Sequence, residues 1–231
     1  PSAGRSPTVP GLSPAEAVRT RRFLGLYASG LVCGLGVFVP FVHLVPFAVD
    51  QGIAPAQAAL LLGAIGIGST AGRFLLGGVA DRVGRDRFLV AMYVGMAVTL
   101  SIWALASLPS GWIVATPLRL SGLLTGFALG FGLFYGGWVA IMPAVVTDYF
   151  GGRQVSGVIG VLYTSVAFGT LVGPVAAGHA YDLTASYRLP IIASVIANLV
   201  AGGLAIATMR TPAPWHAESP SPSPSPSRSP D

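Results

Sequence analysis

Residues 71–87, AGRFLLGGVADRVGRDR, join a long apolar run to a short loop crowded with charge. The apolar run covers residues 56–80, and Arg73 lies inside it, about two helical turns before its end. Two aspartates and three arginines then follow within residues 81–87. A chain that is poor in charge therefore places several of its charged residues in one short segment, and this segment needs a structural or functional explanation.

The composition indicates an integral membrane protein. Of the 231 residues, 53% are hydrophobic and 9% are charged, whereas a soluble domain averages about 25% charged residues. Such a chain has too little polar surface to cover itself in water. The net charge of +5 does not indicate nucleic-acid binding, because the arginines adjoin apolar runs and form no basic face with interleaved aromatic side chains.

Six segments are long and apolar enough for a membrane-spanning helix, which needs about 20 mostly apolar residues. The expected spans are residues 23–49, 56–80, 88–108, 118–146, 155–180 and 187–209. None of them alternates in polarity as the strand of a membrane barrel does. We therefore expect an all-α, polytopic membrane protein with a six-helix transmembrane bundle over residues 23–210. The flanking residues 1–22 and 211–231 are rich in Pro and Ser at their outer parts, and we expect both to be disordered.

The placement of arginine predicts the orientation, because cytoplasmic loops carry an excess of basic residues. With the N-terminus in the cytoplasm, ten arginines lie on the cytoplasmic side and two on the outer side. The ten are Arg5, Arg19, Arg21, Arg22, Arg82, Arg85, Arg87, Arg153, Arg210 and Arg228, and the two are Arg119 and Arg188. We expect a multi-pass protein of the cytoplasmic (inner) cell membrane with both termini in the cytoplasm. The chain begins with Pro1 instead of Met, which we interpret as a fragment or a processed product.

Glycines recur at helical spacing in two spans, which predicts close helix packing, because a neighbouring helix can approach where side chains are missing. In the fourth span these glycines are Gly122, Gly126 and Gly130. In the fifth span they are Gly157, Gly160, Gly169 and Gly173.

The charged loop combines glycines, an aspartate and arginines at fixed offsets. Gly77 and Gly84 permit close helix approach and a tight turn. Asp81 can accept hydrogen bonds from the backbone N–H groups at a helix start, or it can pair with an arginine. Arginines in this loop can anchor it at an anionic membrane surface. The loop arginines are Arg82, Arg85 and Arg87.

This loop resembles the signature loop of the major facilitator superfamily, whose pattern is G-x-L-A-D-R-x-G-R-K-R. In this chain it reads GGVADRVGRDR, with Val79 in place of the usual Leu and Asp86 in place of a usual basic residue. Members of that superfamily have twelve helices in two six-helix halves, and the loop follows the second helix of each half. The resemblance implies that this chain forms one half of a major facilitator fold.

Two further stretches resemble the group of monocarboxylate transporters and oxalate:formate antiporters, and they indicate the C-terminal half. The stretches are FVPFVHLVPFAVDQGI, from residue 38, and FGLFYGGWVAIMPAVVTDYFG, from residue 131. The resemblance implies a missing N-terminal six-helix half as partner. It also implies alternating access, with the loop at Asp81 acting as a conformational gate that docks on that half.

Arg73 stands eight residues before Asp81, where members of this group carry an intramembrane arginine that holds a substrate carboxylate. An arginine within a span costs about 2.5–3.5 kcal/mol on insertion scales, so it usually faces a polar cavity or a partner. A guanidinium can hold a carboxylate through two parallel hydrogen bonds. The alternative is an arginine that extends to the membrane interface and pairs there with Asp81 or Asp148. The antiporters carry a lysine in the fifth span, and its absence here favours a monoanion as substrate.

Four more side chains within the spans are candidates for substrate binding. His43 suits proton handling or contact with an anion, and the alternative is a neutral histidine that is hydrogen-bonded between helices. Pro40 and Pro46 flank it and are expected to bend this helix. The aromatic candidates can line a cavity, or they can pack between helices. They are Tyr135, Trp138 and Tyr163.

These observations predict secondary transport of a small, monocarboxylate-like anion, with membrane lipid as the surroundings and with a proton or a counter-anion as the coupled ion. Two alternatives stay open: half of a major facilitator drug exporter, and a non-transporting membrane subunit or six-helix homodimer. We expect no enzyme, because the sequence contains no nucleophile elbow and no phosphate-binding loop. We expect no cofactor and no metal, because the three histidines lie on separate segments without metal-ligand spacing.

Overall fold

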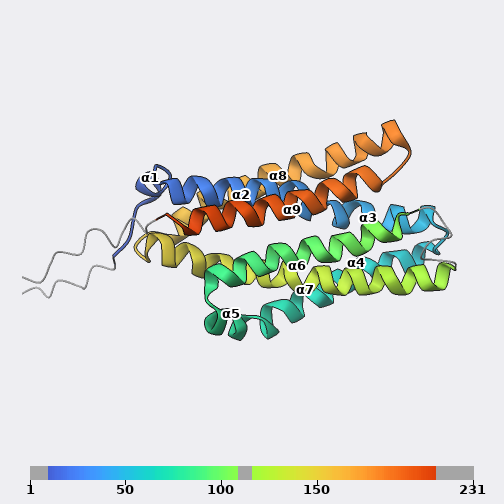
Figure 1. Ribbon diagram of the computed structural model, residues 1–231, viewed down its shortest axis with the longest axis horizontal. Helices are drawn as coiled ribbons and strands as arrows, with labels where there is room; N and C mark the ends of the chain where they lie inside the picture. The colour runs from blue at the N-terminus through green and yellow to red at the C-terminus, as the bar shows by residue number, and fades with distance from the viewer. Residues whose placement is uncertain (1–9, 109–115, 212–231) are drawn as a thin grey trace, which may run out of the picture.

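Residues 10–108 and 116–211 are described by the computed structural model of the chain, and helices make up most of this part (Figure 1). The helices are α1 (Pro14–Ala17), α2 (Arg21–Val37), α3 (Val39–Asp50), α4 (Pro55–Leu75), α5 (Gly77–Val83), α6 (Arg85–Ala106), α7 (Pro117–Phe150), α8 (Val155–Thr184) and α9 (Arg188–Met209). The expectations of disorder for residues 1–9 and 212–231 lie outside the described residues.

Six stretches are long and apolar enough to cross a membrane, and α2 and α3 together form the first of them. They are Arg21–Asp50, Pro55–Leu75, Arg85–Ala106, Leu118–Phe150, Val155–Thr184 and Arg188–Met209. Each predicted span therefore has its counterpart, and the ends differ by several residues. The fourth and fifth spans extend four residues beyond their predicted ends, at residues 146 and 180, to Phe150 and Thr184.

The long helices lie side by side in one bundle (Figure 1). α4 packs on α7, α2 packs on α8 and α9, and α6 packs on α7 and α9. The short helices α1 and α5 lie at the same end of the bundle as the start of α2 and the end of α9 (Figure 1). We call this the arginine-rich end, because Arg22, Arg85 and Arg153 lie there, and the other the opposite end.

The first span is broken into two helices, as its prolines predict. The break lies at Phe38, and Pro40 stands in the first turn of α3, where its missing N–H leaves no helical bond unmade. Pro46 lies inside α3, which continues through it to Asp50.

The second span ends earlier than residue 80, the predicted end. α4 stops at Leu75, and the short helix α5 begins at Gly77 after a single intervening residue. Consecutive glycines at 77 and 78 are weak helix formers, which accounts for a break at this point. The greater part of the signature loop is therefore itself helical.

Residues 10–20 are ordered, in contrast to the disorder expected for the whole segment 1–22. The Leu12 N–H donates to the Phe150 carbonyl at 2.8 Å, and the Gly152 N–H donates to the Pro10 carbonyl at 3.1 Å. The segment is therefore fixed to the turn between α7 and α8. In α1, hydrogen bonds from the Ser13 N–H and hydroxyl hold the pKa of Glu16 below its usual value.

The backbones of α4 and α7 pack closely against each other. An added Cβ at Gly72 would collide with the Leu133 carbonyl, and one at Gly136 would collide with the Ser69 carbonyl. The glycines at 68 and 132 face the partner backbone in the same way. Since lipid supplies no hydrophobic drive for helix pairing, this close approach gains dispersion contacts that larger side chains would prevent.

The fourth-span glycines predicted to pack are not the ones that do so. Gly122 and Gly126 face open space, and Gly130 meets only the Thr99 methyl, because the packed face of α7 is the one that carries Gly132 and Gly136. In the fifth span the prediction holds in part. An added Cβ at Gly169 or Gly173 would collide with the backbone of α2, Gly157 lies against a Pro14 side-chain carbon, and Gly160 is open.

Replacing Gly136 by Ala should destabilise the bundle, because the added methyl group has to push α4 away from α7. Overpacking of this kind costs about 1–3 kcal/mol. We expect a lower thermal midpoint in detergent, measured by the loss of the monodisperse peak in size-exclusion chromatography. Gly203→Ala is the matched control, because Gly203 faces open space and alanine favours a helix by about 1 kcal/mol. Equal midpoints for the two variants would contradict the close approach of α4 and α7.

Candidate functional site

Arg73 lies in the last turn of α4, closer to a helix end than the sequence predicts, yet it is level with the middle of α7. The adjacent Gly72 packs on Leu133 and Gly137, and α7 continues for more than three turns beyond them. The Arg73 side chain is exposed and makes no hydrogen bond or ion pair with any other residue that the structure describes. A permanent positive charge is thus available at mid-depth of the bundle.

The two aspartates that offered Arg73 an alternative partner are paired elsewhere. Arg85 Nη1 lies 2.7 Å from Asp148 Oδ1, and Arg85 Nη2 lies 3.7 Å from Asp81 Oδ1. Arg85 thus takes the role of ion-pair partner at the arginine-rich end. The sequence left the choice open between substrate and aspartate for Arg73, and neither of these aspartates forms an ion pair with it.

Two of the predicted aromatic residues lie on α7 and α8. Gly72, next to Arg73, packs on Leu133 and Gly137, and Tyr135 stands between these two residues on α7. Tyr163 lies on α8, which also contacts α7, and both tyrosines are half-buried. Arg73 and Tyr135 therefore belong to the same stretch of the contact between α4 and α7.

The other two predicted residues lie in packed surroundings. Trp138 is 1% exposed and stacks on Tyr135 with a centroid distance of 6.3 Å. His43 is buried, with Nε2 at 3.0 Å from the Pro174 carbonyl and its ring at 5.7 Å from the Tyr187 ring. Trp138 is therefore a buried packing partner of the Tyr135 ring, and His43 links α3 to α8 through its contact with the Pro174 carbonyl.

Two aromatic residues of this region were not among the sequence candidates. Phe38 lies at the break between α2 and α3, and Phe41 follows in the first turn of α3. Their rings meet Tyr135 at 6.2 and 5.4 Å between centroids, and both are half-buried. The signal in the sequence was the FVPF stretch, because a helix break next to proline exposes side chains that a straight helix would bury.

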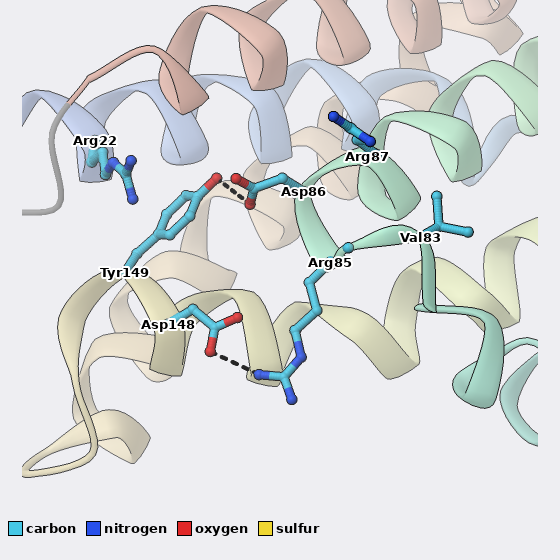
Figure 2. Close-up of a pocket in the computed structure, with 8 residues that line it drawn as sticks. Arg22, Val83, Arg85, Asp86, Arg87, Asp148 and Tyr149 are labelled. Atoms are coloured by element: carbon cyan, nitrogen blue, oxygen red, sulfur yellow. Dashed lines mark hydrogen bonds and ion pairs between the residues drawn. The ribbon is translucent and has the colours of Figure 1, made fainter. Parts of the chain in front are cut away.

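A second cluster of charged residues lies at the arginine-rich end, around a cavity of about 410 Å³ (Figure 2). Its lining combines cations and carboxylates from the starts of α2 and α6, the end of α7 and the turn after α5. The lining residues are Arg22, Val83, Gly84, Arg85, Asp86, Arg87, Asp148 and Tyr149. We call this set the gate cluster.

The gate cluster joins the ends of four helices. The Tyr149 hydroxyl donates to Asp86 Oδ1 at 2.6 Å, which ties α7 to α6, as does the Arg85–Asp148 pair (Figure 2). Arg22, on α2, lies 4.1 Å above the centroid of the Tyr149 ring. Its Nε also donates at 2.7 Å to the carbonyl of residue 211, just beyond α9. Asp86, a departure from the family pattern, therefore has a specific partner.

The remaining residues of the predicted gate loop are exposed. Gly84 has φ +93°, a conformation that favours glycine, so the predicted tight turn is present. Gly77 has open space where a side chain would stand. The Asp81 side chain is 72% exposed. Arg82 and Arg87 are exposed too, and neither forms an ion pair with another described residue.

The chemistry open to these groups is binding of anions and pairing of charges. Among residues 10–108 and 116–211, no three side chains of His, Cys, Asp or Glu come together as a metal site. The Arg73 region presents a guanidinium beside aromatic rings, and the gate cluster presents arginines and aspartates in alternation.

Comparison with known proteins shows the family to which the chain belongs. The sequence matches the profile described as Major Facilitator Superfamily over residues 8–229. Monocarboxylate transporter 12-B of Danio rerio is 32% identical over 165 residues, which cover 71% of this chain and 33% of that protein. Monocarboxylate transporter 11 of Homo sapiens is 29% identical over 195 residues, or 81% of this chain and 40% of that protein.

Monocarboxylate transporter 3 of Rattus norvegicus is 29% identical over 171 residues, which cover 73% of this chain and 33% of that protein. The chain thus spans between about a third and two fifths of the length of these relatives. The profile match covers nearly the whole chain, and the six spans and the signature loop lie within it. This multi-pass membrane protein belongs to the major facilitator superfamily and resembles its monocarboxylate transporters.

Proposed function

We propose that the chain forms the C-terminal six-helix half of a secondary transporter that carries a small monocarboxylate by alternating access. The observation that carries this proposal is Arg73, an exposed guanidinium at mid-depth of a membrane bundle without an ion-pair partner among the described residues. A charge at that depth costs about 2.5–3.5 kcal/mol of insertion free energy, so a charged residue within a span usually has a functional role. A bound carboxylate supplies the missing partner through two parallel hydrogen bonds.

The distribution of acidic side chains supports an anionic substrate. The aspartates of the described spans stand at helix ends, so none competes with a substrate for Arg73 at mid-depth. They are Asp50, Asp86, Asp148 and Asp182. The phenol groups of Tyr135 and Tyr163 can donate hydrogen bonds to the same substrate. These three side chains form the proposed substrate site.

The orientation follows from the two ends of the bundle. The arginine-rich end faces the cytoplasm in our proposal, because basic residues are retained on that side of the cytoplasmic membrane. Both termini then lie in the cytoplasm, and Arg119 and Arg188 lie outside. Coupling to a proton or to a counter-anion belongs to the proposal. Since the described spans hold no carboxylate at mid-depth, a carboxylate relay for protons would come from the N-terminal half.

The gate cluster acts in this proposal as the cytoplasmic latch of the alternating-access cycle. The contacts of Arg85, Tyr149 and Arg22 hold α2, α6, α7 and α9 together, so this half moves as one body. Asp81 lies at the edge of the cluster and is largely exposed, so it can pair with a helix of the other half. Such a pair forms when the cytoplasmic side closes and breaks when that side opens.

Arg73→Lys should lower the uptake of a monocarboxylate such as pyruvate by about tenfold or more, because the paired hydrogen bonds are lost while the charge remains. The measurement is initial uptake by the complete transporter in proteoliposomes, normalised to the amount of protein. Arg119→Lys is the matched control, since Arg119 is exposed at the opposite end. Equal uptake by Arg73→Lys and by the control would assign Arg73 to the membrane interface and remove the support for an anion site.

Asp81→Asn should slow turnover and leave substrate affinity nearly unchanged, because the substitution removes the charge of the latch and leaves the substrate site intact. The maximal rate and the half-saturating concentration of pyruvate uptake separate the two effects. Asp182→Asn, at an exposed position of the opposite end, is the control. A large loss of affinity at normal turnover would contradict the assignment of Asp81 to the latch.

The 231-residue chain reconstituted without an N-terminal half should not take up anions, because alternating access needs two halves that move around one site. Uptake of labelled pyruvate by liposomes with the chain alone, compared with liposomes that contain the complete transporter, measures this directly. Anion uptake by the chain alone would overturn the assignment as a half and would favour a self-sufficient six-helix homodimer.

A further inference from the structure

Three aromatic rings form a continuous surface beside Arg73. Phe38 and Phe41 lie 5.2 Å apart between centroids, and each meets the Tyr135 ring edge-on, at interplanar angles of 85° and 65°. All three are half-buried, so none of them is closed off completely by the surrounding helices. We call Phe38, Phe41 and Tyr135 the aromatic shelf.

The aromatic shelf rests on rings that are fully buried. Phe131 lies parallel to Tyr135 at 6.3 Å and meets Phe41 at 6.1 Å, while Trp138 stacks on Tyr135 at 6.3 Å. Phe131 is 0% exposed and Trp138 is 1% exposed. Because the buried rings fix the positions of the outer ones, the shelf keeps its shape without a bound molecule.

The aromatic shelf and the Arg73 charge belong to one site. Tyr135 is the shared member, because its ring contacts both phenylalanines and because it lies between Leu133 and Gly137, the residues on which Gly72, the neighbour of Arg73, packs. A molecule whose carboxylate binds Arg73 therefore has its remaining atoms next to the shelf. Two or three carbon atoms leave most of the shelf uncovered, whereas a phenyl group covers it and gains edge or stacking contacts with the rings.

The same arrangement opposes a second negative charge on the substrate. A second carboxylate would lie against aromatic rings, and the described residues of the shelf offer it no cation. Loss of its hydration would then go without compensation. The site thus discriminates against dicarboxylates by its apolar wall, in addition to the single charge of Arg73.

We propose that the aromatic shelf selects monocarboxylates with an aromatic side group, such as 2-oxo acids that carry a phenyl ring, over short aliphatic anions. The proposal rests on the proposed transport function and specifies the substrate class of the same site. In it Arg73 holds the carboxylate, and Phe38, Phe41 and Tyr135 hold the ring.

The test compares labelled phenylpyruvate with labelled pyruvate in proteoliposomes that contain the complete transporter. We expect kcat/KM to be about tenfold higher for phenylpyruvate, because burial of a phenyl ring strengthens binding by at least that factor. Phe41→Leu should reduce this ratio to about threefold or less, because an aromatic contact with the phenyl group is lost. Phe168→Leu, at a 59% exposed position on α8, is the matched control and should leave the ratio unchanged.

The outcomes separate the inference from the proposed function. Uptake of both anions that depends on Arg73 but does not favour phenylpyruvate would overturn the inference and leave the transport function standing. No Arg73-dependent uptake of either anion would overturn the transport function itself. If Phe41→Leu lowers the uptake of both anions equally, the ring is structural and the inference fails.

A series of competitors makes the test independent of how the variants fold. The unmodified transporter is tested with 2-oxo acids whose side groups are methyl, isobutyl, cyclohexyl and phenyl. Inhibition that rises along the series and is strongest for phenyl supports an aromatic surface. Inhibition that falls as the side group grows overturns it.

Discussion

The contact on which the rest of the structure depends is the backbone-to-backbone packing of α4 on α7. Gly72 and Gly136 leave no side chain between these helices, so their separation is set by the carbonyl groups themselves. This contact fixes the depth of Arg73, which directly follows Gly72, and it brings the end of α4 against the stretch of α7 that carries Tyr135. A membrane helix that approached α7 less closely would carry the same arginine at a different depth. The position of the charge is therefore a consequence of packing between two surfaces without side chains.

Several charged residues at the arginine-rich end pair with one another, whereas the charged residue in the middle of the bundle pairs with none that the structure describes. At the arginine-rich end, Arg85 and Asp148 neutralise each other, and Tyr149 binds Asp86, so the helix ends are joined by groups that satisfy one another. At mid-depth, Arg73 has no such partner among the described residues. Structural ion pairs near the membrane surface stabilise little on their own but fix geometry. This contrast between paired charges and an unpaired guanidinium distinguishes the proposed site from the gate cluster.

Much of this architecture could be predicted from the sequence, because length and hydropathy determine which segments span a membrane. The exact helix contacts could not. Gly122 and Gly132 belong to the same glycine-rich helix, and only the position of α4 decides which of them is packed. The role of Asp86 depends on Tyr149, which is 63 residues away. Residues 10–20 read as linker because the α7–α8 turn that orders them is equally remote. Motifs thus identified the charged residues, and tertiary contacts assigned their partners.

The break at Leu76 brings the proposed substrate site and the proposed latch onto one continuous stretch of chain. Arg73 lies in the last turn of α4, α5 begins four residues after it, and Asp81 lies on that short helix. α5 makes few contacts beyond its neighbours α4, α6 and α7, while α4 is fixed to α7 by its glycines. In the proposed cycle, an anion at Arg73 would bind to a tightly packed helix, whereas closure at Asp81 would act on a short segment with fewer contacts. Such a half would move as one body and would change its contact with the proposed partner half at a single loop.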